Sequence, residues 1–212
     1  MRLTVLKLLA VASVLTPAAA VAQGGKPAPA TATYIMKADI DKVSATEQSK
    51  STRDENVKIV DLGYENFALG IVHRASTRTP PPPASAAAAA QSQPCGRMMA
   101  TLPPGGTPGG ITHDEQTEGY VIISGGGTMF TDVYIINGRH NNQDPQGGPN
   151  GPTCGGMAYG VKKVAVRVGD VVIVPPDVVH GWADIPDHVD YLSFRPSQHL
   201  LQAGWVNPTI AK

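Results

Sequence analysis

Short runs of β-branched and aromatic residues, separated by glycine, proline, asparagine and aspartate, make up most of this chain after residue 57. Such runs are typical of strands, and turn residues between them favour an all-β sandwich or barrel. The 23 glycines and 19 prolines among 212 residues argue against a helical bundle, because both destabilise helix interiors. We therefore predict one β-barrel of jelly-roll type with its core at about residues 57–196. Predicted strands cover residues 67–73, 119–123, 129–136, 161–168, 171–174 and 191–194.

The first 22 residues have the pattern of a secretory signal peptide. Two basic residues precede an apolar run at 8–15, and a small-x-small sequence, Ala-Val-Ala, ends at residue 22. A membrane anchor is the alternative, but this run is short for a span and Pro17 interrupts its end. We expect export to the periplasm or the cell exterior, with a linker at 23–36 and a single domain at 37–212.

The charge pattern and the missing motifs exclude several function classes. The chain has 17 Lys+Arg against 17 Asp+Glu without a basic cluster, so no nucleic-acid partner is expected. The glycines at 125–127 lack the Lys-Ser/Thr pair of a phosphate loop, and no Gly-x-Ser-x-Gly elbow occurs. No segment after the signal peptide could span a bilayer, so no membrane partner is expected either.

Two segments near the start of the domain have a clear periodicity. The spacing of Ile40 and Val43 among charged residues predicts one short helix within residues 37–47. Further on, Phe67, Leu69, Ile71 and His73 alternate along a predicted strand and share one of its faces. We expect this face to look inward.

Two stretches rich in proline, glycine and small residues are predicted to be insertion loops, at 76–93 and 137–156. A cysteine lies at the end of each, Cys95 and Cys154. In an oxidising compartment a Cys95–Cys154 disulfide would join the two loops and contribute about 4 kcal/mol through loop entropy. Two free buried thiols are the alternative.

Two further segments have a spacing that is informative. The first, at 105–125, reads G-x5-I-x-H-x4-E-x6-G, and the second, at 169–184, reads G-x5-P-x-D-x2-H-x3-D. In order and spacing both resemble the two signature motifs of the cupin superfamily, and the surrounding sequence is similar to that of small secreted bacterial cupins. Three positions differ: Ile111 stands where the family has its first histidine, Asp177 where it has glycine, and Asp184 where it has asparagine.

The resemblance implies a double-stranded β-helix barrel with one divalent metal ion held by His113, Glu118 and His180. Two imidazoles and one carboxylate are typical of non-haem Fe(II), which is favoured slightly, and Mn(II), Ni(II) or Zn(II) are alternatives. Ile111 cannot be the fourth ligand. Each histidine taken singly could also be an ordinary, partly buried side chain, and Glu118 a solvated carboxylate at a strand end.

Several other side chains are candidates for the barrel interior. His73 could reach it as a fourth ligand or as an acid or base, although a hydrogen-bonded core histidine is the stronger reading. Tyr120 is the second catalytic candidate; Tyr120, Ile122 and Trp182 would line a pocket or pack in the core. Arg195 would pair with a carboxylate substrate or, preferably, with Asp190. The sequence assigns no role to His140, His188 or His199.

These expectations favour a metal-dependent enzyme, either an oxygenase or a lyase or isomerase, because three protein ligands leave coordination positions open. Aromatic and aliphatic side chains with few cations suit a small organic acid, phenol or ketone better than a phosphorylated compound. The alternative is a cupin that binds a small molecule without changing it. A homodimer is also compatible with the sequence.

Overall fold

The computed structural model describes residues 29–45, 52–78, 92–131, 133–141, 150–160 and 162–211. The predicted signal peptide and most of the predicted 76–93 loop lie outside these residues. One short helix and eleven strands make up the regular structure: α1 (Lys37–Ser44), β1 (Arg53–Asp61), β2 (Asn66–Ala75), β3 (Pro94–Cys95), β4 (Thr107–His113), β5 (Glu118–Thr131), β6 (Tyr134–Asn141), β7 (Thr153–Tyr159), β8 (Lys162–Arg167), β9 (Val171–Val174), β10 (Gly181–Asp184) and β11 (His188–Ser197).

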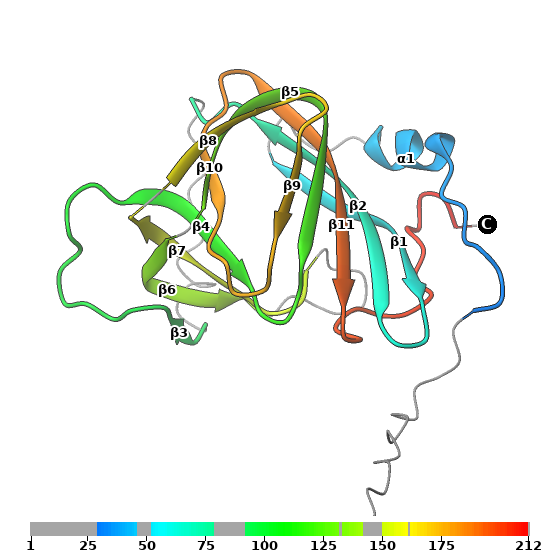
Figure 1. Ribbon diagram of the computed structural model, residues 1–212, viewed down its shortest axis with the longest axis horizontal. Helices are drawn as coiled ribbons and strands as arrows, with labels where there is room; N and C mark the ends of the chain where they lie inside the picture. Colours follow the sequence, from blue (N-terminus) through cyan, green and yellow to red (C-terminus); the bar gives the residue numbers. More distant parts are fainter. Residues whose placement is uncertain are drawn as a thin grey trace, which may run out of the picture.

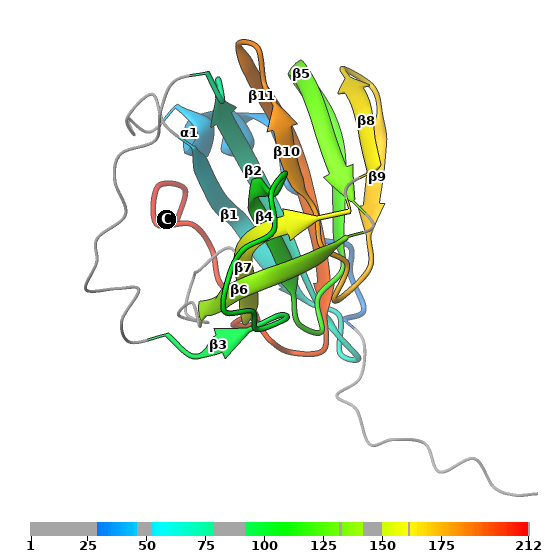
Figure 2. The same cartoon turned by 90° about the vertical axis from the view of Figure 1, so that its left-hand side faces the viewer.

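The strands form two antiparallel sheets that face each other across the barrel (Figures 1 and 2). The larger sheet has the order β1-β2-β11-β5-β10, with β8 and β9 also paired to β5, and the smaller has the order β3-β6-β7-β4. This architecture confirms the predicted all-β, cupin-like fold.

Strand β5 connects the two halves of the larger sheet. Its first half pairs with β9 and β11, whereas its second half pairs with β8 and β10. The change of partners occurs at Gly125, which has a φ of 62°. A side chain does not fit at this position, because its Cβ would lie 2.0 Å from the carbonyl oxygen of His188. Only glycine adopts this conformation so close to a backbone, which explains the last glycine of the first motif.

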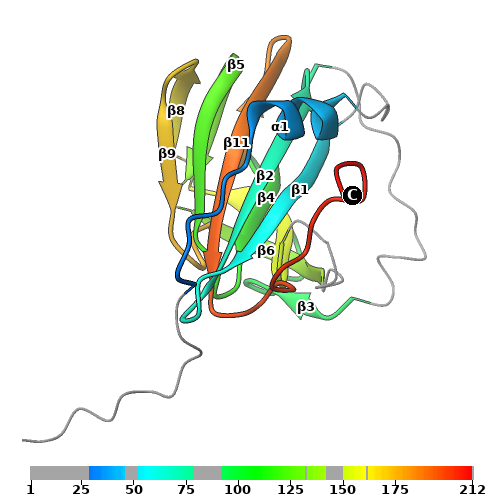
Figure 3. The ribbon, with the colours of Figure 1, turned by 90° about the vertical axis from the view of Figure 1, so that its right-hand side faces the viewer.

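The inner face of the larger sheet carries the barrel core. Val72, Tyr120, Ile122, Met129, Val166, Ile185, Val189 and Tyr191 form one buried cluster. The face of β2 with Phe67, Leu69, Ile71 and His73 is the opposite one: Ile71 packs with Val43 of α1 on the outside of the sheet (Figure 3). The prediction that this face looks inward is therefore wrong. Both faces of β2 are apolar and both are covered, so periodicity alone could not separate them.

Several predicted boundaries also need correction. β1 begins at Arg53, four residues before the predicted onset at Val57, and the predicted strand at 129–136 is two strands, because β5 ends at Thr131 and β6 begins at Tyr134. The predicted loop at 137–156 is wrong at both ends, since β6 continues to Asn141 and β7 starts at Thr153. Glycines here build strands with bulges rather than a loop, as the register shift in β6 shows.

Cys95 and Cys154 form the predicted disulfide. The bond joins β3 to β7 across the intervening β6, and the two Cα atoms are 6.0 Å apart. In a flat sheet strands two positions apart lie about 9.6 Å from each other, so the small sheet must curl here. Gly138 of β6 allows this, since a Cβ there would lie 3.0 Å from both sulfurs. The disulfide suggests a non-reducing compartment.

Within the described ranges, no helix has the length and apolar character needed to cross a membrane.

Candidate metal centre

Backbone hydrogen bonds between the two motifs bring His113 and His180 together. The N–H of Ile111 donates to the carbonyl of His180 and the N–H of His180 donates to that of Ile111, both at 2.9 Å. The N–H of Asp177 donates to the carbonyl of His113 at 3.0 Å. These bonds fix the end of β4 against the segment that leads into β10, and the two imidazole rings lie 5.2 Å apart between their centroids.

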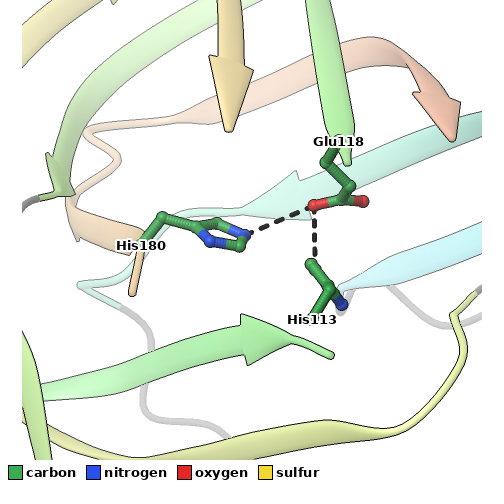
Figure 4. A group of neighbouring side chains, drawn as sticks. All are labelled: His113, Glu118 and His180. Atoms are coloured by element: carbon green, nitrogen blue, oxygen red, sulfur yellow. Dashed lines mark hydrogen bonds and ion pairs between the residues drawn. The ribbon is translucent and has the colours of Figure 1, made fainter. Parts of the chain in front are cut away.

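Glu118, the first residue of β5, completes the group. Its Oε2 atom lies 3.0 Å from Nε2 of His113 and 3.3 Å from Nε2 of His180 (Figure 4). All three side chains are at most 4% exposed. The turn between His113 and Glu118, in which Glu115 has a φ of 58°, reverses the chain so that both side chains point to the same place. The predicted trio is thus brought together, and it could bind a metal ion.

The hydrogen bond of His180 bears on whether a cation could lie between these atoms. Nδ1 of His180 donates to the carbonyl of Val178 at 3.0 Å, so a neutral His180 ring has its lone pair on Nε2. That lone pair faces the carboxylate of Glu118, and two acceptors at 3.3 Å repel each other unless a proton or a metal ion lies between them. In His113, Nδ1 is buried and has no hydrogen-bond partner among the described residues, so no hydrogen bond at Nδ1 selects the tautomer of this ring.

The other oxygen of Glu118 is held by the inner face of β11. Oε1 accepts hydrogen bonds from Nε of Arg195 at 2.7 Å and from the hydroxyl of Ser193 at 3.1 Å. Burial by itself raises the pKa of Glu118, but the charge of Arg195 and the neighbouring imidazoles of His113 and His180 outweigh it and keep the pKa well below its ordinary value. Glu118 is therefore a carboxylate, which is the form that ligates metals.

The predicted ion pair between Arg195 and Asp190 is wrong. Arg195 is fully buried, and its second ion pair is with Asp54 of β1, where Nη2 lies 2.7 and 2.8 Å from the two carboxylate oxygens. Positions 195 and 190 are an odd number of residues apart on β11, so their side chains point to opposite faces of the sheet. Arg195 shares the inner face with Tyr191 and Ser193, and this alternation could have shown its direction.

Sequence reasoning missed two residues of this network, Asp54 and Ser193. Asp54 lies on β1 before the predicted onset of the barrel at residue 57, and Ser193 lies on β11, of which only residues 191–194 were predicted. Neither residue belongs to a motif. Because Asp54 is 141 residues from Arg195 in the chain, no local signal links them.

Tyr120, the second catalytic candidate, lies beside the trio. Its hydroxyl donates a short hydrogen bond to Oε2 of Glu118. Burial and the charge of Glu118 raise the pKa of Tyr120 well above its ordinary value, so the hydroxyl keeps its proton. Its ring packs 4.4 Å from that of Tyr191. Ile122 belongs to the same core cluster and Trp182 packs against that cluster, so both contribute to the barrel core.

His73, the first catalytic candidate, points away from the trio. It lies on the outer face of β2, where Nδ1 pairs with Asp190 at 2.5 Å and the ring stacks on His188 at 6.2 Å. Its side chain is 39% exposed. His73 therefore shares no face with Tyr120 and has no direct way to reach an ion held by the trio.

The three departures from the motif pattern have structural reasons or effects. Asp177 has a φ of 61°, the left-handed conformation that the family's glycine adopts, and aspartate tolerates it better than most residues. Asp184 forms an exposed ion pair with Arg78 at 3.6 Å. Ile111 shares the face of β4 with His113 two residues further on, and its aliphatic side chain has no atom that could ligate a metal ion.

Known proteins offer only distant likenesses. No family model and no curated protein matches the chain. Among solved structures, peruvianin-I, a cysteine peptidase from the latex of Thevetia peruviana, is 9% identical with a TM-score of 0.35, over 73% of this chain and 66% of that one. Oxalate oxidase bound to the substrate analogue glycolate is 12% identical with a TM-score of 0.34, over 73% and 54%. A second oxalate oxidase structure is also 12% identical, with a TM-score of 0.33, over 76% and 58%. The chain thus spans between about half and two thirds of the length of these proteins.

Proposed function

We propose that the protein binds one divalent metal ion through His113, Glu118 and His180 and uses it in an enzymatic reaction outside the cytoplasm. The observation that carries this proposal is the convergence of Nε2 of both histidines on Oε2 of Glu118, with two acceptors facing each other at 3.3 Å. The disulfide and the pattern of the first 22 residues support a periplasmic or secreted location.

The spacing of the donor atoms fits a metal ion. Two ligand atoms that are each about 2.1 Å from one ion lie about 3.0–3.4 Å apart at octahedral or tetrahedral angles. The separations of Oε2 of Glu118 from Nε2 of His113 and of His180, 3.0 and 3.3 Å, fall in this range. Two imidazoles and a carboxylate suit Fe(II) slightly better than Mn(II), Ni(II) or Zn(II), and all four accept this donor set.

A bound ion would supply Lewis acidity, and iron would add oxygen chemistry. Side chains of the protein would provide the other requirements of a reaction, namely an apolar contact for the substrate and a group that holds a proton. Ile111, on the same face of β4 as His113, would present an aliphatic side chain to a bound substrate, which suits a small organic acid, phenol or ketone. The hydroxyl of Tyr120, which donates to Glu118, is a group that could hold a proton close to a bound substrate. Oxygenase and lyase or isomerase reactions both fit this arrangement.

The alternative function is a binding protein without catalysis. The observation in its favour is that Glu118 already accepts hydrogen bonds at both oxygens, from Arg195 and Ser193 at Oε1 and from Tyr120 at Oε2. A network this complete could serve as the polar floor of an apolar pocket.

The metal proposal predicts a clear difference between two histidine variants. Protein purified without chelator should contain about one divalent ion per chain, and His180→Ala should contain almost none, because one of three ligands is lost. His73→Ala is the matched control and should keep its metal, because His73 lies on the outer face. Elemental analysis, with circular dichroism to confirm folding, measures both. Equal metal in wild type and in folded His180→Ala would refute the site.

The metal-loaded protein then separates the two functions. We would incubate it with phenols, keto acids and small carboxylic acids, with and without oxygen, and follow the products by mass spectrometry. Turnover that disappears in Glu118→Gln supports the enzyme. Tight binding without any product, unchanged in Glu118→Gln, supports the binding protein.

A further inference from the structure

We propose that Arg195 and Asp54 are positioning residues of the metal centre: Arg195 fixes Glu118 as a ligand through one oxygen, and Asp54 cancels the charge of Arg195 so that Glu118 keeps its charge for the ion. This inference rests on the proposed metal function. It assigns a role to two charged side chains outside the three ligands, the fully buried Arg195 and the partly buried Asp54.

Arg195 restricts the orientation of the Glu118 carboxylate. The guanidinium Nε and the Ser193 hydroxyl both donate to Oε1, at 2.7 and 3.1 Å. With these two bonds in place, the carboxylate cannot turn Oε1 toward the imidazoles, and only Oε2 faces them. Donors that orient a ligand in this way tune metal affinity nearly as strongly as the ligands themselves.

The surroundings of Arg195 are built to receive its side chain. Nη1 donates to Oδ1 of Asn56 at 3.3 Å, and Nη2 donates to both oxygens of Asp54. On the neighbouring strand β2, a Cβ at Gly70 would lie 2.7 Å from Nη1, so the guanidinium fills the space that a side chain at this position would need. Arg195 is 0% exposed, which means that it cannot move into solvent without opening the barrel.

The ion-paired group of Glu118, Arg195 and Asp54 carries one net negative charge. Arg74 of β2, which donates to the hydroxyl of Tyr191, adds a positive charge that acts on Asp54 and Tyr120. Glu118 and Asp54 are two carboxylates, and Arg195 is the single guanidinium that lies between them. If Asp54 were neutral, the charge of Arg195 would cancel that of Glu118 and repel a metal ion nearby. Because the site is buried, these charges interact more strongly than they would in water.

The first test compares two neighbouring variants of β1. Asp54→Asn keeps the shape and a hydrogen-bond acceptor for Arg195 but removes the charge. Glu55→Gln removes a charge at similar exposure on the outer face, where Glu55 pairs with Arg53. We would titrate metal-free proteins with Co(II) and measure Kd against a competing chelator. We expect Asp54→Asn to bind about 10–100-fold more weakly and Glu55→Gln to bind like the wild type.

The second test separates the hydrogen-bond geometry of the Arg195 side chain from its positive charge. Arg195→Lys keeps a positive charge but cannot donate to Glu118 and Asp54 with the same planar fork. We expect the visible absorption bands of bound Co(II), which report the ligand geometry, to shift in Arg195→Lys and to stay unchanged in Glu55→Gln. Thermal unfolding of the metal-free proteins shows whether each variant is folded.

The outcomes distinguish the two proposals. If the wild type binds no Co(II), the proposed function fails and this inference fails with it. If the wild type binds Co(II) and Asp54→Asn matches it in affinity, the role of Asp54 is refuted while the metal site stands. If folded Arg195→Lys matches the wild-type spectrum, the positioning role of Arg195 is refuted. If Arg195→Lys does not fold, the Asp54→Asn result decides alone.

Discussion

Replacing Arg195 by methionine should lower the free energy of unfolding by about 3–5 kcal/mol in metal-free protein. The side chain is fully buried and lies between Glu118 and Asp54, so its removal leaves two carboxylates without a counter-charge. Urea unfolding at neutral pH with a chelator present measures the loss. Arg78→Met is the matched control, because Arg78 forms an exposed ion pair with Asp184 that should contribute less than about 1 kcal/mol.

The loss of unfolding free energy in Arg195→Met should depend on pH and become smaller as the pH falls. In the wild type the pKa of Glu118 is depressed below its unfolded value, so its ion pair stabilises the fold above that value and loses this effect as the pH falls. Without Arg195, burial is left to raise the pKa of Glu118, and the carboxyl can become neutral on mild acidification. The difference between variant and wild type should therefore shrink below neutral pH. A loss as small as that of Arg78→Met would contradict the buried position of Arg195.

Loss of the Cys95–Cys154 bond should cost about 4 kcal/mol, the second large effect. The bond closes a loop with a sequence separation of 59 residues, and the loop-entropy relation gives this magnitude for such a loop. Urea unfolding of a Cys95→Ser, Cys154→Ser double variant measures it. Wild type in reductant should approach the stability of the double variant.

The control for this experiment is the double variant itself, whose stability should not change when reductant is added. Thiol counting on denatured, non-reduced wild type should find no free thiol. Two free thiols, or a double variant within about 1 kcal/mol of the wild type, would be incompatible with the bond that joins β3 to β7.

The sequence by itself predicted the barrel and the grouping of His113, Glu118 and His180. Frequent turn residues between short apolar runs specify strands locally, and the grouping of the three side chains followed from the resemblance of the two motifs to those of cupins. The chain has only two cysteines, so a disulfide within it could join only Cys95 to Cys154, but the choice between this bond and two free thiols came from the structure. The strands depend on residues close together in the chain, whose geometry is set by backbone conformation, whereas His180 and Cys154 lie far along the chain from the residues they meet in the fold.

Only the tertiary structure decided which face of β2 is inside and what holds Glu118. Both faces of β2 are apolar, and α1 covers the outer one, so His73 was assigned to the wrong side. Arg195 and Asp54 come from β11 and β1, and the register of β2 between them brings the two side chains together. Pairing between strands is a long-range choice that depends on the whole sheet, and for this reason the buried charges around the metal trio could not be predicted from the sequence.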